Sequence, residues 1–320
     1  MIPRLTAGSA LAVAASALLA ALALTFTAGV TGPPTAAHAA VQPQLRHAVP
    51  EAKFAGPALS YSDAWVAAHG SPGLNGMQAQ AAVLVDLDHH RLLWAQGAHD
   101  QRATASLAKI VTVLVALDKE PLDRLLTVPE GALDTNPDHT TMGLAAGEQV
   151  TVRELLYGIF LVSGNDAAEA LAQTAEPRAA FIADMNAKAA GIGMRDSHFS
   201  NPTGLDQAGE TSTAYDLALA TGYLAERYPD LLAIAQQPEV WLYANAGHPE
   251  FDLVNLNKLI LWPYPGATGL KTGYTDAAGG CVAATAERDG RHLVAVVLGS
   301  DVMFSDAQRL FDYGFSVWGQ

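Results

Sequence analysis

The chain has 320 residues, of which 50% are hydrophobic and 16% are charged, and its formal net charge is −14. This length and composition suit a folded protein with a sizeable core and exclude an intrinsically disordered chain. The acidic charge, without a cluster of lysines or arginines, argues against nucleic acid as a partner.

The first 39 residues have the pattern of a secretory signal peptide. Arg4 precedes an uncharged stretch rich in alanine and leucine from Leu5 to Val30, and Ala37-His38-Ala39 satisfies the small-x-small rule of signal peptidase. We therefore predict cleavage after Ala39. The alternative is an uncleaved membrane anchor, because the apolar stretch is long enough to span a bilayer. Both interpretations put the body of the protein outside the cytoplasm.

The segment 40–75 is rich in Pro, Gly, Ala and Gln without a sustained period, so a leader or linker is predicted there. A folded domain is expected from residue 76 to 316, followed by a tail over 317–320. It begins with apolar strands over 78–87 and 91–95, which a turn joins into a hairpin.

The middle of the chain, from Ser106 to about Arg227, is mostly helical by its pattern, so a helical lobe is expected over about 110–260. One helix opens at Thr151 with Glu154 three residues later, which is the spacing of a capping box. Further helical patterns cover 165–175, 176–190 and 211–228.

Strands return over 269–275, 280–287 and 291–299, and a helix over 305–315 ends the domain. We predict an α+β fold: an antiparallel sheet built from N- and C-terminal strands and flanked by helices, with a mostly helical lobe inserted. A cleft between the two parts is the expected position of a site. The single cysteine, Cys281, is predicted to be a buried strand residue. A C-terminal membrane anchor is not predicted after the last helix.

Ser106 and Lys109 stand three residues apart at the start of a predicted helix, which puts them on one face. A serine hydroxyl is a weak nucleophile and needs a base, and a lysine can be that base when burial or a neighbouring cation lowers its pKa. The S-x-x-K pattern is weak alone, because it occurs about once by chance in a chain of this length. The alternative is a serine in the helix cap beside a surface lysine.

Ser163-Gly164-Asn165 lies between two helical patterns and is predicted to be a tight turn. In the functional interpretation, Ser163 relays a proton to a leaving group, and Asn165 holds Lys109 and a substrate amide. The alternative is an ordinary cap between two helices.

Lys271-Thr272-Gly273 lies on a predicted strand. Gly273 has no side chain, so a ligand backbone can lie against the strand, and Lys271 and Thr272 would face a ligand carboxylate. The alternative is an edge strand that uses its lysine against aggregation.

The S-x-x-K, S-x-N and K-T-G motifs follow one another at distances of 57 and 108 residues. This order is similar to that of penicillin-binding proteins and class A β-lactamases. The chain most resembles the low-molecular-mass penicillin-binding D-alanyl-D-alanine carboxypeptidases, serine peptidase family S11. The resemblance covers about residues 75–316 and includes the longer segments 141–172, 181–206 and 269–300.

The resemblance implies a penicillin-binding peptidase domain that acts on the stem peptides of peptidoglycan and takes β-lactams as covalent inhibitors. Ser106 would attack the carbonyl of the D-Ala-D-Ala bond with Lys109 as general base. Ser163 and Asn165 would shuttle the proton and align the amide. Water would then hydrolyse the acyl-enzyme, and no metal or other cofactor is implied.

The resemblance also implies the substrate-binding residues. Lys271 and Thr272 would bind the terminal carboxylate. The backbone N–H groups of Ser106 and of Tyr274, which follows Gly273, would form an oxyanion hole. The resemblance further implies an arginine just before the last helix, but Met303 stands there, and Arg309 lies farther along, inside the helix.

Three other functions compete with the carboxypeptidase. A class A β-lactamase needs a deacylating glutamate about 35 residues after its second motif. This chain has "SHFSNPTGLD" at that place, and the next glutamate along the chain is Glu210. Gly164 also stands where that enzyme has aspartate. An endopeptidase that cuts peptide cross-links and a β-lactam or cell-wall binding module without turnover both remain open.

Overall fold

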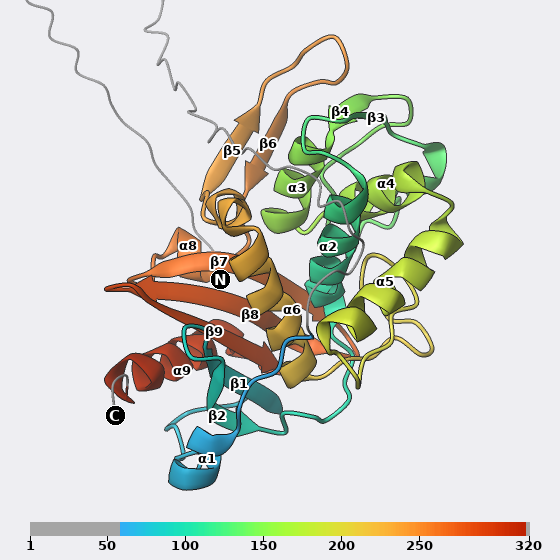
Figure 1. The fold of residues 1–320 in the computed structure, drawn as a ribbon. Coiled ribbons are helices and arrows are strands. Elements are labelled where there is room, and N and C mark those ends of the chain that lie inside the picture. Colours follow the sequence, from blue (N-terminus) through green and yellow to red (C-terminus); the bar gives the residue numbers. More distant parts are fainter. Residues whose placement is uncertain (1–57, 318–320) are drawn as a thin grey trace, which may run out of the picture. The chain divides into compact units, whose positions relative to one another are not determined.

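The computed structural model describes residues 58–317, and its centre is a five-stranded antiparallel sheet with the order β2-β1-β9-β8-β7 (Figure 1). The strands are β1 (Ala81–Asp86), β2 (Arg91–Gln96), β7 (Ala267–Thr275), β8 (Gly279–Arg288) and β9 (Arg291–Leu298). The predicted α+β class and the sheet from both ends of the domain are confirmed. The predicted signal peptide and the tail beyond Val317 lie outside the described residues.

Most of the remaining elements are helical and come between β2 and β7 in the chain. They are η1 (Ala105–Ala108), α2 (Lys109–Lys119), η2 (Glu130–Ala132), α3 (Val152–Phe160), α4 (Asn165–Ala175), α5 (Arg178–Ile192), α6 (Ala214–Arg227), η3 (Pro229–Leu231), α7 (Leu232–Ala235) and α8 (Lys258–Leu261). Helices α2 to α5 pack on one another as a lobe beside the sheet, with α2 at its centre (Figure 1).

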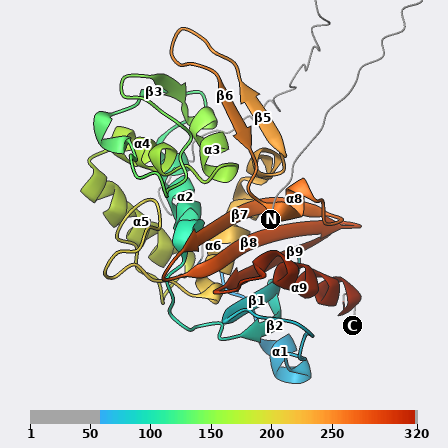
Figure 2. The same ribbon diagram turned by 180° about the vertical axis from the view of Figure 1, so that it is seen from behind.

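The two faces of the sheet are covered by different helices, and the strand alternation decides which side chain meets which helix. Val83 and Val85 belong to the large core shared with α6 and the helical lobe. Ala82 and Leu84 point to the other face, into a smaller core with α9 (Met303–Val317). Figure 2 shows α9 against the sheet from that side. Cys281 on β8 is fully buried, as predicted.

The predicted capping box at the start of α3 is confirmed. The Thr151 hydroxyl accepts from the backbone N–H of Glu154, and the Glu154 carboxylate accepts from the backbone N–H of Thr151. This cap satisfies N–H groups that have no partner inside the helix. It fixes the start of the helix whose other end leads into the Ser163 turn.

The structure differs from the prediction in the segment expected to be a linker and in the helical lobe. Helix α1 (Ala64–His69) packs on β2, with Trp65 buried and the guanidinium of Arg91 4.9 Å from its ring centroid. Residues 120–151, expected to be largely helical, carry only η2 and the short strands β3 (Leu125–Thr127) and β4 (Gln149–Thr151). An additional hairpin, which was not predicted, joins β5 (Glu239–Leu242) and β6 (Phe251–Val254).

These elements escaped prediction for one reason. A helix of six residues or a strand of three or four is too short to show a hydrophobic period. Separately, between residues 58 and 317 no helix combines the length and the apolar character that crossing a membrane requires.

Candidate active site

Ser106 lies in the turn η1, directly before α2, and Lys109 is the first residue of that helix. The i, i+3 spacing brings the two side chains together: the Lys109 Nζ donates a hydrogen bond to the Ser106 Oγ at 2.7 Å. Ala105, just before the serine, has a positive φ of 49° and is fully buried. The backbone is therefore held in an unfavourable conformation next to the hydroxyl.

The Lys109 ammonium is completely buried and uses all three of its donors. Besides Ser106, it donates to the Asn165 Oδ1 at 2.7 Å and to the backbone carbonyl of Thr203 at 2.8 Å. The alternative of a surface lysine beside a cap serine is thereby excluded. Each of these acceptors is neutral, so the ammonium has no carboxylate in direct contact.

Burial lowers the pKa of Lys109 to about 7, because a charged ammonium loses its hydration there. The carboxylates of Asp166, Asp134 and Glu169 act in the opposite direction from a greater distance. A large fraction of Lys109 is therefore neutral near pH 7, which is what a base requires.

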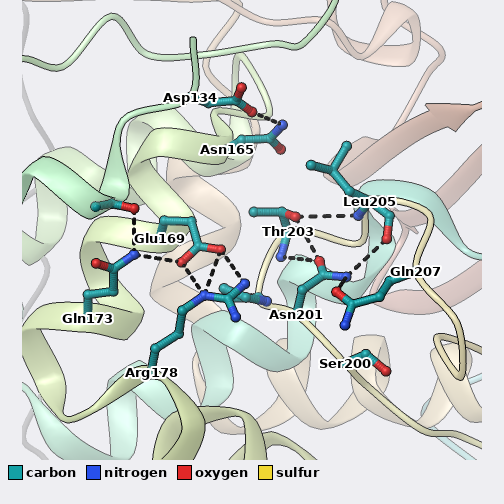
Figure 3. A network of polar contacts seen from close by, with 12 residues as sticks. Asp134, Asn165, Glu169, Gln173, Arg178, Ser200, Asn201, Thr203, Leu205 and Gln207 are labelled. Carbon is teal, nitrogen blue, oxygen red and sulfur yellow. Dashed lines mark hydrogen bonds and ion pairs between the residues drawn. The ribbon is translucent and has the colours of Figure 1, made fainter. Parts of the chain in front are cut away.

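Ser163 and Asn165 lie in the turn between α3 and α4. Ser163 has a φ of 61°, which turns the chain sharply so that Asn165 can start α4. The Asn165 amide has a defined orientation: its Oδ1 accepts from Lys109, and its Nδ2 donates to the Asp134 Oδ2 at 2.8 Å (Figure 3). Asp134 in turn accepts from the ring of His139 at 2.8 Å.

Lys271 projects from β7, an edge strand of the sheet, and is nevertheless fully buried. Its Nζ donates to the Ser163 Oγ at 2.8 Å and to the backbone carbonyl of Thr272 at 2.6 Å. Burial, followed by the proximity of Lys109, lowers its pKa well below the ordinary value. The alternative of an exposed lysine that protects an edge strand is therefore wrong.

Gly273 allows β7 to lie directly against the nucleophile turn. A Cβ at this position would come within 2.8 Å of the Ser106 backbone nitrogen and 3.0 Å of the Ala105 Cβ. The sequence pattern explains Gly273 by a ligand backbone that lies against the strand. The structure adds a second reason, which is the close packing of the strand on η1.

The motifs meet at a cleft of about 360 Å³. Ser106, Ser163, Asn165, Thr272, Gly273 and Tyr274 line it. Lys109 and Lys271 lie behind this lining and reach it through their hydrogen bonds to the two serines. All eight residues selected from the sequence thus lie at one place, between the sheet and the helical lobe.

Two groups that contact the motif residues, the Asp134 carboxylate and the Thr203 backbone carbonyl, could not be predicted from the sequence. Asp134 is 31 positions from Asn165 in a segment without a period. Thr203 contributes a backbone carbonyl, which any residue type supplies. The Asn201 Oδ1 bends this loop by accepting from the backbone and the hydroxyl of Thr203 and from the backbone of Gly204 (Figure 3).

Gly204 should be intolerant of a side chain. Its φ is 78°, and a Cβ would collide with the backbone carbonyl of Ala105. Gly204→Ala should therefore cost about 1–3 kcal/mol of stability from backbone strain alone, and it should also move the Thr203 carbonyl away from Lys109. Thermal unfolding measures the loss. Gly73→Ala, where the added Cβ meets nothing within 4 Å, is the control and should leave the melting temperature unchanged.

Glu210 and Arg309 lie outside the arrangement described above. Glu210 is 9% exposed, accepts from the backbone N–H groups of Ser200 and Asn201, and lines a different hollow from that of Ser106. Met303 lines the cleft, as expected from its position, whereas Arg309 pairs with Asp306 on its own helix.

Comparison with known proteins gives one consistent result. The sequence profile of peptidase family S11, described as D-alanyl-D-alanine carboxypeptidase, matches residues 67–302. A D-alanyl-D-alanine carboxypeptidase of Mycobacterium tuberculosis is 36% identical over 265 residues, which are 80% of this chain and 89% of the relative. One of Bacillus subtilis is 34% identical over 248 residues, which are 75% of this chain. The chain spans 62% of the length of that relative.

Solved structures agree with the sequence relatives. The crystal structure of a D-alanyl-D-alanine carboxypeptidase from Mycobacterium tuberculosis superimposes with a TM-score of 0.72 at 33% identity, covering 79% of this chain and 96% of that one. The structure of a DD-transpeptidase from Streptomyces superimposes with a TM-score of 0.71 at 28% identity, covering 77% and 99%.

Proposed function

Because the chain belongs to the S11 family of serine peptidases, we propose that it is a serine D-Ala-D-Ala carboxypeptidase. It removes the terminal D-alanine from the stem pentapeptides of peptidoglycan through an acyl-enzyme. The observation that carries this proposal is the Ser106–Lys109 pair: a hydroxyl 2.7 Å from a buried amine whose pKa is about 7. An activated nucleophile of this kind is needed for acyl transfer.

In the proposed reaction, neutral Lys109 accepts the Ser106 hydroxyl proton while the oxygen attacks the carbonyl carbon of the D-Ala-D-Ala bond. The backbone N–H groups of Ser106 and Tyr274 stabilise the oxyanion. When the C–N bond breaks, the leaving amine takes a proton from the Ser163 hydroxyl. The proton that Lys109 accepted then returns to the Ser163 oxygen, so that Lys109 is neutral again for deacylation. Water then cleaves the ester and regenerates Ser106.

On the substrate side, Thr272 supplies a hydroxyl in the wall of the cleft, and Lys271 lies behind it. Asn165 lines the same cleft while its Oδ1 is held by Lys109. We assign Asn165 to the alignment of a substrate amide and Lys271 and Thr272 to the carboxylate side.

We propose that β-lactams acylate the same serine and remain bound. A β-lactamase uses a glutamate to direct water onto the acyl group. The Glu210 carboxylate accepts a hydrogen bond from the backbone N–H of Ser200 and does not line the cleft, so we do not assign it that role. The binding-module alternative predicts acylation without turnover of peptides. The endopeptidase alternative predicts that the protein also splits cross-linked dimers.

One comparison of substrates separates these activities. A carboxypeptidase releases free D-alanine from a pentapeptide and leaves a cross-linked dimer intact. An endopeptidase splits the dimer into two monomers. Liquid chromatography of both digests from one preparation distinguishes them, and cleavage of the dimer at a rate equal to that of the pentapeptide would contradict the narrower proposal.

The acylation rate should depend on pH through Lys109. Burial lowers the pKa of this residue to about 7, and the negative charges of Asp134 and other carboxylates oppose this by raising it. The rate should rise with pH through a midpoint about 7, because only the neutral amine is a base. Asp134→Asn removes a nearby negative charge, so the pKa and the midpoint should move to lower pH.

The measurement is the second-order rate of β-lactam labelling across neutral pH. Asp138→Asn is the matched control, because Asp138 lines the cleft without contacting Asn165. An unchanged midpoint in Asp134→Asn would show that the rate does not follow the charge state of Lys109.

We also propose that the domain works outside the cytoplasm. The pattern of residues 1–39 supports export, and peptidoglycan stem peptides are found there. Mass spectrometry of the protein recovered from the culture medium or envelope tests this. A chain that begins at Ala40 is expected from signal cleavage.

A further inference from the structure

The cleft that contains Ser106 continues into a second hollow of about 430 Å³. Lys258, Tyr274, Met303 and Phe304 line both spaces. These four residues come from α8, β7 and the start of α9, so three separate elements form the passage between the two spaces. A ligand held at Ser106 can therefore extend past them.

Lys258 differs from every other lysine that the structure describes. Lys119 and Lys188 form ion pairs with carboxylates, and Lys109 and Lys271 are buried behind the cleft. Lys258 is exposed, and between residues 58 and 317 no carboxylate lies within ion-pair distance of it.

Aromatic rings hold the Lys258 ammonium in place. Its Nζ lies 5.4 Å from the ring centroid of Trp262 and 5.8 Å from that of Phe304, both within the range of a cation–π contact. Phe304 is itself part of the cleft lining. Such contacts restrict a flexible side chain without neutralising its charge, so the ammonium keeps donors for an anion.

Lys258 adds an exposed cation to the cleft, on which Lys271 and Thr272 are assigned to the carboxylate side. Lys271 is buried and already donates hydrogen bonds to the Ser163 hydroxyl and to the backbone carbonyl of Thr272. Met303 is apolar, and Asp138, which also lines the cleft, repels an anion. Lys258 is thus the one lysine or arginine in the described lining of the cleft.

We propose that Lys258 binds the terminal carboxylate of the substrate and is a specificity-determining residue for ligands with a free C-terminus. This assignment rests on the proposed carboxypeptidase function. Thr272 donates a hydroxyl to the same carboxylate from the strand side. Trp262 and Phe304 keep the ammonium in position.

The test compares two ligands on variants that cannot turn them over. In the Ser106→Ala background, the Kd of an N-acylated D-Ala-D-Ala peptide is measured with a free carboxylate and with a C-terminal amide. Lys258→Met should weaken binding of the free acid by about tenfold, the usual worth of a hydrogen bond to a charged group, and leave the amide unchanged. Lys258→Arg should retain the preference for the acid.

Arg195→Met is the matched control. Arg195 is exposed and lies outside the cleft lining, and the substitution removes one positive charge, as Lys258→Met does. An equal loss for acid and amide, or no loss for the acid, overturns the proposal. A failure of the proposed function has a different signature: the wild-type protein would release no D-alanine. The acid-over-amide preference in the Ser106→Ala background does not depend on that release.

Discussion

Ser106→Ala should eliminate covalent labelling by a β-lactam. In the wild-type protein, the Ser106 Oγ lies 2.7 Å from an amine that can accept its proton, so we expect one penicilloyl group per chain. Without the hydroxyl no ester can form at this position, and the labelling rate should fall by at least about three orders of magnitude. Intact-mass spectrometry gives the stoichiometry, and peptide mapping gives the modified residue.

Ser163→Ala is the control for this experiment, because Ser163 lines the same cleft. That variant should still be labelled at Ser106, although more slowly, since it has lost only the proposed proton relay. An adduct on Ser163 or on another serine in the Ser106→Ala protein would show that the nucleophile has been misassigned.

Lys109→Arg should slow acylation by at least about two orders of magnitude, which is the usual worth of a general base. Arginine retains the positive charge, but it cannot lose a proton at neutral pH. Lys109 can, because its burial lowers the pKa to about 7. The measurement is the second-order rate constant for β-lactam labelling, accompanied by thermal unfolding to exclude a loss of the fold.

Lys119→Arg serves as the comparison at the other end of α2. Lys119 pairs with Asp184 at 2.6 Å, a contact that arginine can also make. Its acylation rate should equal that of the wild type. A near-normal rate in Lys109→Arg would mean that Lys109 is a structural cation and that the base is another group.

The motif residues could be predicted because each motif is short and local. Ser106 and Lys109 are brought together by a single helical turn, and Ser163 and Asn165 by a single tight bend. Their assembly over distances of 57 and 108 residues is not a local property. It followed from the resemblance of the motif order to a known family.

The parts of the site that escaped prediction depend on tertiary structure. The Thr203 carbonyl reaches Lys109 because Asn201 bends the loop and Gly204 lets it approach η1. A backbone carbonyl leaves no mark in the sequence. The burial of Lys271 on an edge strand was likewise invisible, because the pattern of a strand does not show what covers its edge.

The most direct test of the proposed function supplies a D-Ala-D-Ala pentapeptide and penicillin, separately, to one preparation of the protein. We predict repeated release of D-alanine, many molecules per chain, and, with penicillin, one stable adduct on Ser106 with no significant turnover. Fast hydrolysis of penicillin without D-alanine release would identify a β-lactamase instead. A stable adduct with no D-alanine released from any pentapeptide would contradict the carboxypeptidase function and would indicate a binding module without turnover.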